Sequence, residues 1–162
     1  MGSAAMKLTR YEDIEAPISF VYGALADFDH WERMALRRGA EVTRLDTMPL
    51  PGPGMIWNIL FDFRGRRRSV DLQLTALDPG QSIALDGQGT SMSGKARLDL
   101  VEMGPKRMRL AISMEIEART LASRLFLHSL RFASAKINRK FQERTSHLAT
   151  DLEERFRRSG KR

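Results

Sequence analysis

His128 is the residue whose neighbours in the sequence most favour a chemical role. It falls at helical spacing with Leu121, Leu125, Phe132 and Ala135, so these five residues share one face of a helix. We expect this face to point inward, because most of its members are apolar. A histidine there would be neutral near pH 7, with one ring nitrogen free to bond a ligand oxygen. Such a residue can also serve only as core packing, so a ligand contact, an acid/base group and a structural role all stay open.

Several other kinds of catalytic site are excluded or unsupported. The chain has no cysteine, which excludes a disulfide, a thiol nucleophile, a thiolate zinc site and an iron–sulfur cluster. His30 and His147 have no metal-ligand spacing to His128, so we expect no metal site, and no motif indicates a cofactor. Ser91 and Ser93 lack the spacing of a nucleophile elbow. No catalytic residue is therefore assigned from motifs.

Two segments contain residues that bind phosphate in other proteins. Residues 87–94 are glycine-rich but lack the Gly-Lys-Ser/Thr of a phosphate loop, and an alternating strand follows them, so we predict a hairpin turn. The segment Arg64-Gly-Arg-Arg-Arg68 could hold a phosphate or a lipid headgroup, or form a solvated turn. It has no interleaved aromatic residues of the kind that single-stranded nucleic-acid binders use. Glu115 and Glu117 are expected to point outward into solvent.

The net charge of +7 lies in the C-terminal part of the sequence. Residues 119–162 hold twelve Lys and Arg against four acidic residues, whereas residues 1–118 are nearly balanced. The cations Arg124, Arg131, Arg139, Lys140 and Arg144 could contact an anionic membrane surface or an acidic protein. A solvated helix face explains the same pattern. Nucleic acid is the less favoured partner, and a homodimer stays open.

Length and composition fit one globular domain. The chain has 162 residues, of which 42% are apolar and 29% charged. No apolar run approaches the roughly 18 residues that span a bilayer, and no secretory signal is visible, so we expect a cytoplasmic protein. Residues 1–5 precede a second methionine and resemble a vector-derived remnant. We therefore expect one domain over residues 6–158 and a basic tail over residues 159–162.

Hydrophobic periodicity predicts the order of the elements. A strand over residues 7–14 is followed by two short helices, over residues 18–25 and 28–38. After Gly39 the period becomes two, which predicts five or six strands, at residues 41–46, 56–64, 69–75, 83–87, 95–102 and 108–116. A helical period then continues from Thr120 to Arg158, far longer than a typical helix. We expect the N-terminal half of that helix to be buried on a broad face, with a bend or break before the second half.

This order of elements resembles the helix-grip fold of the START-like, or birch-pollen-allergen-like, superfamily, also called SRPBCC. That superfamily includes polyketide cyclase/dehydrase, lipid-transport and coenzyme Q-binding proteins. The resemblance is carried by Lys7–Pro17, where a strand runs into an Ala-Pro helix start, and by Val21–Trp31, which ends in an aspartate, aromatic and tryptophan junction. It covers residues 6–158 and implies an α+β fold, in which a curved antiparallel sheet wraps around the long C-terminal helix. The superfamily has no universal catalytic residues, so none are transferred.

The resemblance also implies a ligand cavity between the sheet and the C-terminal helix. Inward-facing apolar positions then become candidate ligand contacts, although each can equally be core packing. The candidates are Trp57, Phe61, Leu72, Leu98, Leu110, Met114, Leu125, His128 and Phe132.

Three functions fit these predictions. The first is binding or transport of a small hydrophobic molecule, such as a lipid, a quinone or a polyketide-like aromatic compound. The second is an aromatase/cyclase-type enzyme, in which His128, Tyr11 or Asn58 assists proton transfer. The third is a protein that binds a ribosome or an acidic partner through its basic helix. The sequence favours the first and leaves open whether the protein is an enzyme.

Overall fold

A computed structural model describes residues 5–160, so the predicted remnant and basic tail lie largely outside the described residues. In chain order the elements are β1 (Ala5–Ile14), α1 (Ile18–Leu25), α2 (Phe28–Arg37), β2 (Glu41–Arg44), β3 (Ile56–Phe63), β4 (Arg66–Asp78), β5 (Ser82–Gln88), β6 (Met92–Gly104), β7 (Arg107–Ala118), α3 (Leu121–Ser129), the 3₁₀ helix η1 (Leu130–Ala133) and α4 (Ser134–Ser159). Every predicted element is present, with bounds that differ by a few residues.

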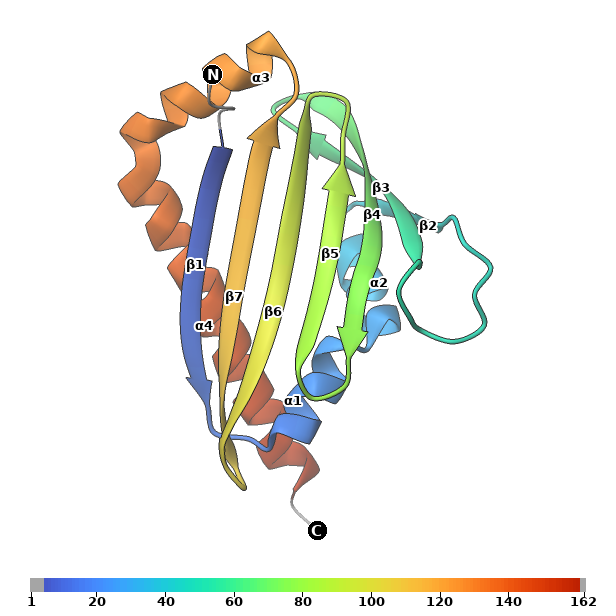
Figure 1. The fold of residues 1–162 in the computed structure, drawn as a ribbon, viewed down its shortest axis with the longest axis vertical. Coiled ribbons are helices and arrows are strands. Elements are labelled where there is room, and N and C mark those ends of the chain that lie inside the picture. The colour runs from blue at the N-terminus through green and yellow to red at the C-terminus, as the bar shows by residue number, and fades with distance from the viewer. Residues whose placement is uncertain (1–4, 161–162) are drawn as a thin grey trace.

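The strands form one open antiparallel sheet in the order β1-β7-β6-β5-β4-β3-β2. Figure 1 shows the sheet curving, with α4 running along the β1 side, α2 behind β4 and β5, and α1 near the lower end of the sheet. Register shifts between Leu74 and Ala76 and between Glu102 and Gly104 interrupt the ladders, and such bulges increase strand bending. This is the α+β helix-grip architecture that the element order predicted.

The two short helices start and stop at residues suited to those positions. Pro17 precedes α1, where its missing N–H removes no helical hydrogen bond. The carboxylate of Asp27 caps α2 by accepting the His30 backbone N–H at 3.3 Å. Gly39, with a φ of 89°, follows the end of α2 and turns the chain toward β2.

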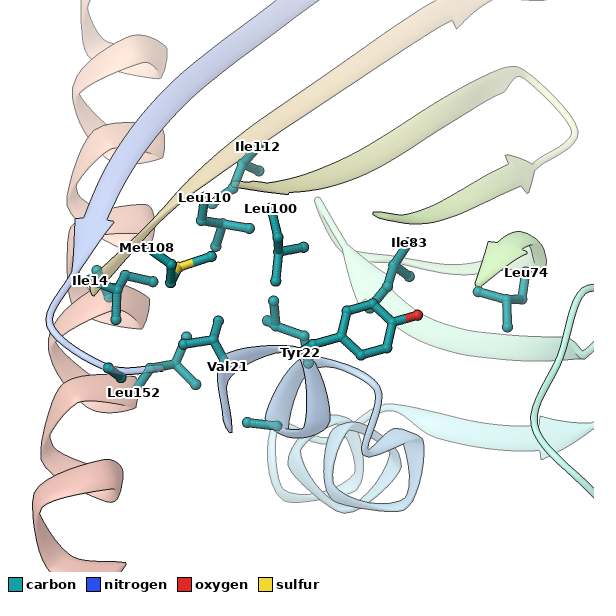
Figure 2. Packing of buried hydrophobic residues seen from close by; sticks show 14 of the residues in the cluster. Ile14, Val21, Tyr22, Leu74, Ile83, Leu100, Met108, Leu110, Ile112 and Leu152 are labelled. Atoms are coloured by element: carbon teal, nitrogen blue, oxygen red, sulfur yellow. The ribbon is translucent and has the colours of Figure 1, made fainter. Parts of the chain in front are cut away.

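The core lies where α1 enters between the concave face of the sheet and α4. Figure 2 shows Val21 of α1 and Leu152 of α4 facing the sheet residues Ile14, Met108 and Leu110. All five side chains are completely buried. Strand alternation explains the sheet contribution, because every second residue of β7 points to this face.

The C-terminal helix is broken, as the sequence predicted. The 3₁₀ segment η1 separates α3 from α4. Polar contacts then hold α4 to the edge strand: Thr145 Oγ1 donates to Glu12 Oε2 at 3.1 Å, and the Glu15 N–H donates to Glu153 Oε2 at 2.8 Å. Within residues 5–160, no helix is both long enough and apolar enough to cross a membrane.

Along the C-terminal helix the N-terminal half is more exposed than the C-terminal half, which is the reverse of the prediction. The prediction of a broadly buried N-terminal half is wrong, because most of α3 and η1 is exposed. The buried residues of α4 are Thr145, Ala149 and Leu152, which lie in the C-terminal half of the predicted 120–158 helix, beside β1 and the core. The edge strand β1, together with the short helix α1, covers this part of the long helix.

Candidate functional site

A cavity of about 270 Å³ lies between the sheet, the two short helices and α4. Its lining is apolar except for one carboxylate, that of Glu32. Helices α1 and α2 supply Leu25, Phe28, Trp31, Glu32 and Ala35, the sheet supplies Val42, Trp57, Ile59, Leu72, Ile83, Leu85 and Leu98, and α4 supplies Leu148.

Strand register and helix spacing explain why these residues meet. Trp57 pairs with Leu72 across β3 and β4, and Ile83 pairs with Leu98 across β5 and β6, so each pair presents two side chains to the same face. On α2 the lining residues recur at the i, i+3, i+4 and i+7 positions that form one helix face. The wall is therefore built by regular secondary structure rather than by loops.

Glu32 and Trp57 form a hydrogen-bonded pair in the cavity wall. Trp57 Nε1 donates to Glu32 Oε1 at 2.6 Å, and the Trp57 side chain is buried. The Phe28 ring lies against the indole, with ring centroids 5.4 Å apart. Within residues 5–160, the second oxygen of Glu32, Oε2, accepts no hydrogen bond. Glu32 is thus a lining residue whose carboxylate keeps one acceptor oxygen without a protein donor.

A second set of contacts holds the Trp57 ring through Arg44 and Asp46. The Arg44 guanidinium lies 5.5 Å from the Trp57 ring centroid and donates to both Asp46 carboxylate oxygens, at 2.6 and 2.9 Å. Asp46 also accepts the backbone N–H groups of Ile56 and Met48. The Arg44 hydrogen bond, followed by that of the Ile56 N–H, holds the pKa of Asp46 well below its usual range. The same contact raises the pKa of Arg44, so both groups stay charged and the guanidinium stays in place.

The sheet residues of the predicted site are divided by the structure. Trp57, Leu72 and Leu98 line the cavity. Leu110 is fully buried in the core, where no ligand reaches it. Phe61 is half-buried beyond the cavity lining, and Met114 is exposed at the part of the sheet near α3.

The helix residues of the predicted site point the wrong way. Leu125, His128 and Phe132 were expected at the cavity wall, and all three are exposed. Ser123 and Leu127 take the inward positions instead: Ser123 Oγ donates to the Ser91 carbonyl at 2.7 Å, and both side chains are buried. These contacts set the rotation of α3, which turns the His128 face to solvent. His128 is therefore not a cavity residue.

The other two acid/base candidates are also outside the cavity. Tyr11 is exposed, and strand alternation places it on the outer face of β1. Asn58 lies on the outer face of β3, where its amide donates to Asp71 Oδ1 at 2.7 Å and to Ser69 Oγ at 2.9 Å. Tyr11, Asn58 and His128 therefore do not line the cavity.

Glu32 was missed by the sequence analysis, although a signal for it exists. Phe28, Trp31 and Ala35 form an apolar stripe on α2, and Glu32 interrupts that stripe at a position that should be apolar. A charged residue at such a position needs a polar partner or a ligand. Trp57, the indole that satisfies it, lies 25 residues away, so only the fold reveals the pair.

The two suspected phosphate segments are hairpins. Residues 87–94 span the turn between β5 and β6, as predicted. The arginine-rich segment forms the tip between β3 and β4, where Arg67 pairs with Glu41 at 3.2 Å and Arg64 lies 4.7 Å from the Phe126 ring centroid. Within residues 5–160, no three His, Asp or Glu side chains are grouped to hold a metal ion.

Comparison with known proteins identifies the fold. No family model matches the chain, and no curated protein matches its sequence. The Zhui aromatase/cyclase from Streptomyces sp. R1128 matches with a TM-score of 0.71 and 15% identity, over 96% of this chain and 98% of its own. A START superfamily protein from Mycobacterium smegmatis matches with a TM-score of 0.62 and 14% identity, over 94% and 97%. Norcoclaurine synthase from Thalictrum flavum, in complex with dopamine and hydroxybenzaldehyde, matches with a TM-score of 0.64 and 11% identity, over 93% of this chain and 87% of its own.

The chain has the helix-grip fold that these START-like structures share. At identities of 11–15% the likeness concerns the fold alone. What this chain binds must be argued from its own cavity.

Proposed function

We propose that the protein binds a small aromatic molecule carrying a hydroxyl group, with the ring in the apolar cavity and the hydroxyl donating to Glu32. The observation that supports this most is the free Oε2 of Glu32 in a wall that is otherwise apolar. A site with many apolar contacts and one placed polar group is the usual design of a small-molecule site. The carboxylate orients the ligand, and the apolar wall supplies most of the affinity.

The size of the cavity favours a compact ligand. Its volume of about 270 Å³ is just below the range of roughly 300–1,000 Å³ that holds drug-sized ligands. A molecule with one or two rings fits this space, whereas a two-chain phospholipid does not. Phe28, Trp31 and Trp57 contribute aromatic surfaces, which favour flat ring systems through offset or edge contacts. The norcoclaurine synthase structure of the same fold holds dopamine and hydroxybenzaldehyde, which both carry ring hydroxyl groups.

The small number of ionisable groups in the cavity wall favours a binding function over cyclase chemistry. Among the described residues that line it, Glu32 is the single ionisable side chain. Proton transfer in a cyclase mechanism is assisted by side chains within hydrogen-bond reach of the reacting atoms, and a second such group beside Glu32 would allow an acid and a base to act together. The residues considered for that second role, His128, Tyr11 and Asn58, lie outside the cavity.

If Glu32 binds the ligand hydroxyl, the protein should prefer a hydroxylated ring to the same ring without a hydroxyl, and Glu32→Gln should reduce that preference. We expect wild-type protein to bind 2-naphthol about tenfold more tightly than naphthalene, because a hydrogen bond to a charged acceptor contributes about 1.5–3 kcal/mol. Glu32→Gln keeps a carbonyl oxygen for Trp57 Nε1 but can present an amide NH₂ at the free position, so the preference should fall to threefold or less. Both affinities can be measured by the quenching of tryptophan fluorescence.

Asp29→Asn provides the matched control, because Asp29 is an exposed carboxylate on the same helix. This variant should keep the wild-type ratio of the two affinities. An unchanged ratio in Glu32→Gln would exclude Glu32 as the orienting group. If wild-type protein binds neither compound, the proposed site itself is wrong.

A further inference from the structure

The outer face of the α3–η1 corner exposes large apolar side chains that the fold does not cover. Leu121 is 71% exposed, Leu125 63% and Phe132 96%. These residues are four and seven positions apart, so they share the face that also carries His128. Exposed apolar residues are common singly, but an aligned set on one helix face indicates an interaction surface.

This face is also at a projecting part of the molecule. Figure 1 shows α3 crossing the end of the sheet, after which the chain bends and α4 runs down beside β1. The bend is η1, residues Leu130–Ala133, so Phe132 sits at the outer corner.

Positive charge surrounds the exposed apolar residues. Residues 119–144 contain seven Lys and Arg but a single acidic residue, Glu143. Arg124 and Arg131 are exposed within the same segment, and neither forms a salt bridge with another described residue. The hairpin tip adds Arg64, whose guanidinium lies against Phe126 of α3.

We propose that this corner surface, made of Leu121, Leu125, Phe132, Arg124 and Arg131, docks on an anionic phospholipid bilayer. Helices that lie in a membrane interface combine such a Leu/Phe face with flanking Lys and Arg. The apolar side chains would enter the boundary of the acyl chains, while the guanidinium groups contact anionic headgroups. A second copy of the chain is disfavoured, because two surfaces of the same strong positive charge would face each other. A nucleic acid would use the arginines but not the leucines.

Vesicle binding by the full chain tests this proposal, with variants that separate the two components. The vesicles are phosphatidylcholine alone or phosphatidylcholine mixed with phosphatidylglycerol, in about 0.1 M salt, where the Debye length is about 10 Å. Leu125→Ser/Phe132→Ser removes apolar surface, and Arg124→Glu/Arg131→Glu reverses charge. Val101→Ser/Met103→Ser and Arg157→Glu/Arg158→Glu make matching changes at exposed positions elsewhere. Circular dichroism confirms that each variant is folded.

Wild-type protein should co-sediment with the anionic vesicles and not with phosphatidylcholine alone. Each corner double variant should bind at least about tenfold more weakly, while both control variants bind as wild type does. Equal binding to both vesicle types, or none to either, would overturn the proposal. So would a charge variant that loses binding while Leu125→Ser/Phe132→Ser retains it, because that outcome indicates a general polyanion site. A dimer in solution that Phe132→Ser dissociates would assign the surface to a second copy instead.

Discussion

Leu98→Trp is expected to weaken the binding of 2-naphthol by at least about a hundredfold, equivalent to about 2.7 kcal/mol. Leu98 lies on β6 opposite Ile83, and its side chain lines the cavity. An indole at this position would occupy much of the 270 Å³ that a bicyclic ligand needs. Overpacking a filled core costs about 1–3 kcal/mol, and an existing cavity reduces that cost, so the variant should remain folded. Isothermal titration calorimetry measures the affinity.

Leu125→Trp is the matched control for this substitution. It makes the same chemical change on α3, but at a side chain that points to solvent. Its affinity for 2-naphthol should equal that of the wild type. If Leu98→Trp binds normally while Leu125→Trp loses binding, the ligand site lies at the helix face that the sequence indicated and not in the cavity between α2 and the sheet.

Leu152→Ala is expected to lower the free energy of unfolding by about 3–4 kcal/mol, the middle of the range for a fully buried leucine. Leu152 has no exposed surface and packs among Ile14, Val21 and the buried residues of β7. Leu125→Ala, on the same C-terminal helical segment, should change the free energy of unfolding by less than about 0.5 kcal/mol. Urea denaturation measures both values.

The comparison of Leu152 with Leu125 tests how the helix is rotated. A large cost at Leu125 and a small one at Leu152 would mean that α3 packs through the face containing His128. The same result would remove the exposed apolar surface on which membrane docking is based. Equal large costs would mean that the α3–η1 corner is covered by a partner in solution.

The order of the elements could be predicted because each element carries its own period. Alternation along β3, β6 and β7 is clear, and the spacing of Val21, Tyr22 and Leu25 identifies the buried face of α1. Three candidate contacts in the cavity, Trp57, Leu72 and Leu98, came from strand alternation. In a strand each side chain faces one of only two sides of the sheet, so alternation is enough to assign it to a face.

The face of α3 could not be predicted in the same way, because this segment has two apolar stripes. Leu121, Leu125 and Phe132 form one, and Leu127 and Leu130 belong to the other. Local spacing does not distinguish them. Only contacts distant in sequence do so, such as the hydrogen bond from Ser123 Oγ to the Ser91 carbonyl.

The position of the cavity could not be predicted from local patterns either, because it depends on contacts between residues that are distant in the sequence. The apolar stripe of residues 121–135 predicts a ligand beside Leu125 and His128, whereas the cavity lies beside α2 and Leu148 of α4. The pairing of Glu32 with Trp57 requires the two short helices to lie over β3, and no local pattern contains that information. A charged residue within an apolar helix stripe, such as Glu32, indicates that a polar partner exists. It does not indicate which residue that partner is.

The central claim is that a ligand occupies the cavity between α2 and the sheet, and methyl NMR during a titration with 2-naphthol tests it most directly. The leucine methyl groups of the wild-type protein are recorded and assigned by single Leu→Ile variants. We expect the largest shifts at Leu25, Leu72, Leu85, Leu98 and Leu148, which line the cavity, and no shift at Leu121 and Leu125. Shifts confined to Leu121 and Leu125, or saturation without any shift at the five cavity leucines, would contradict this claim.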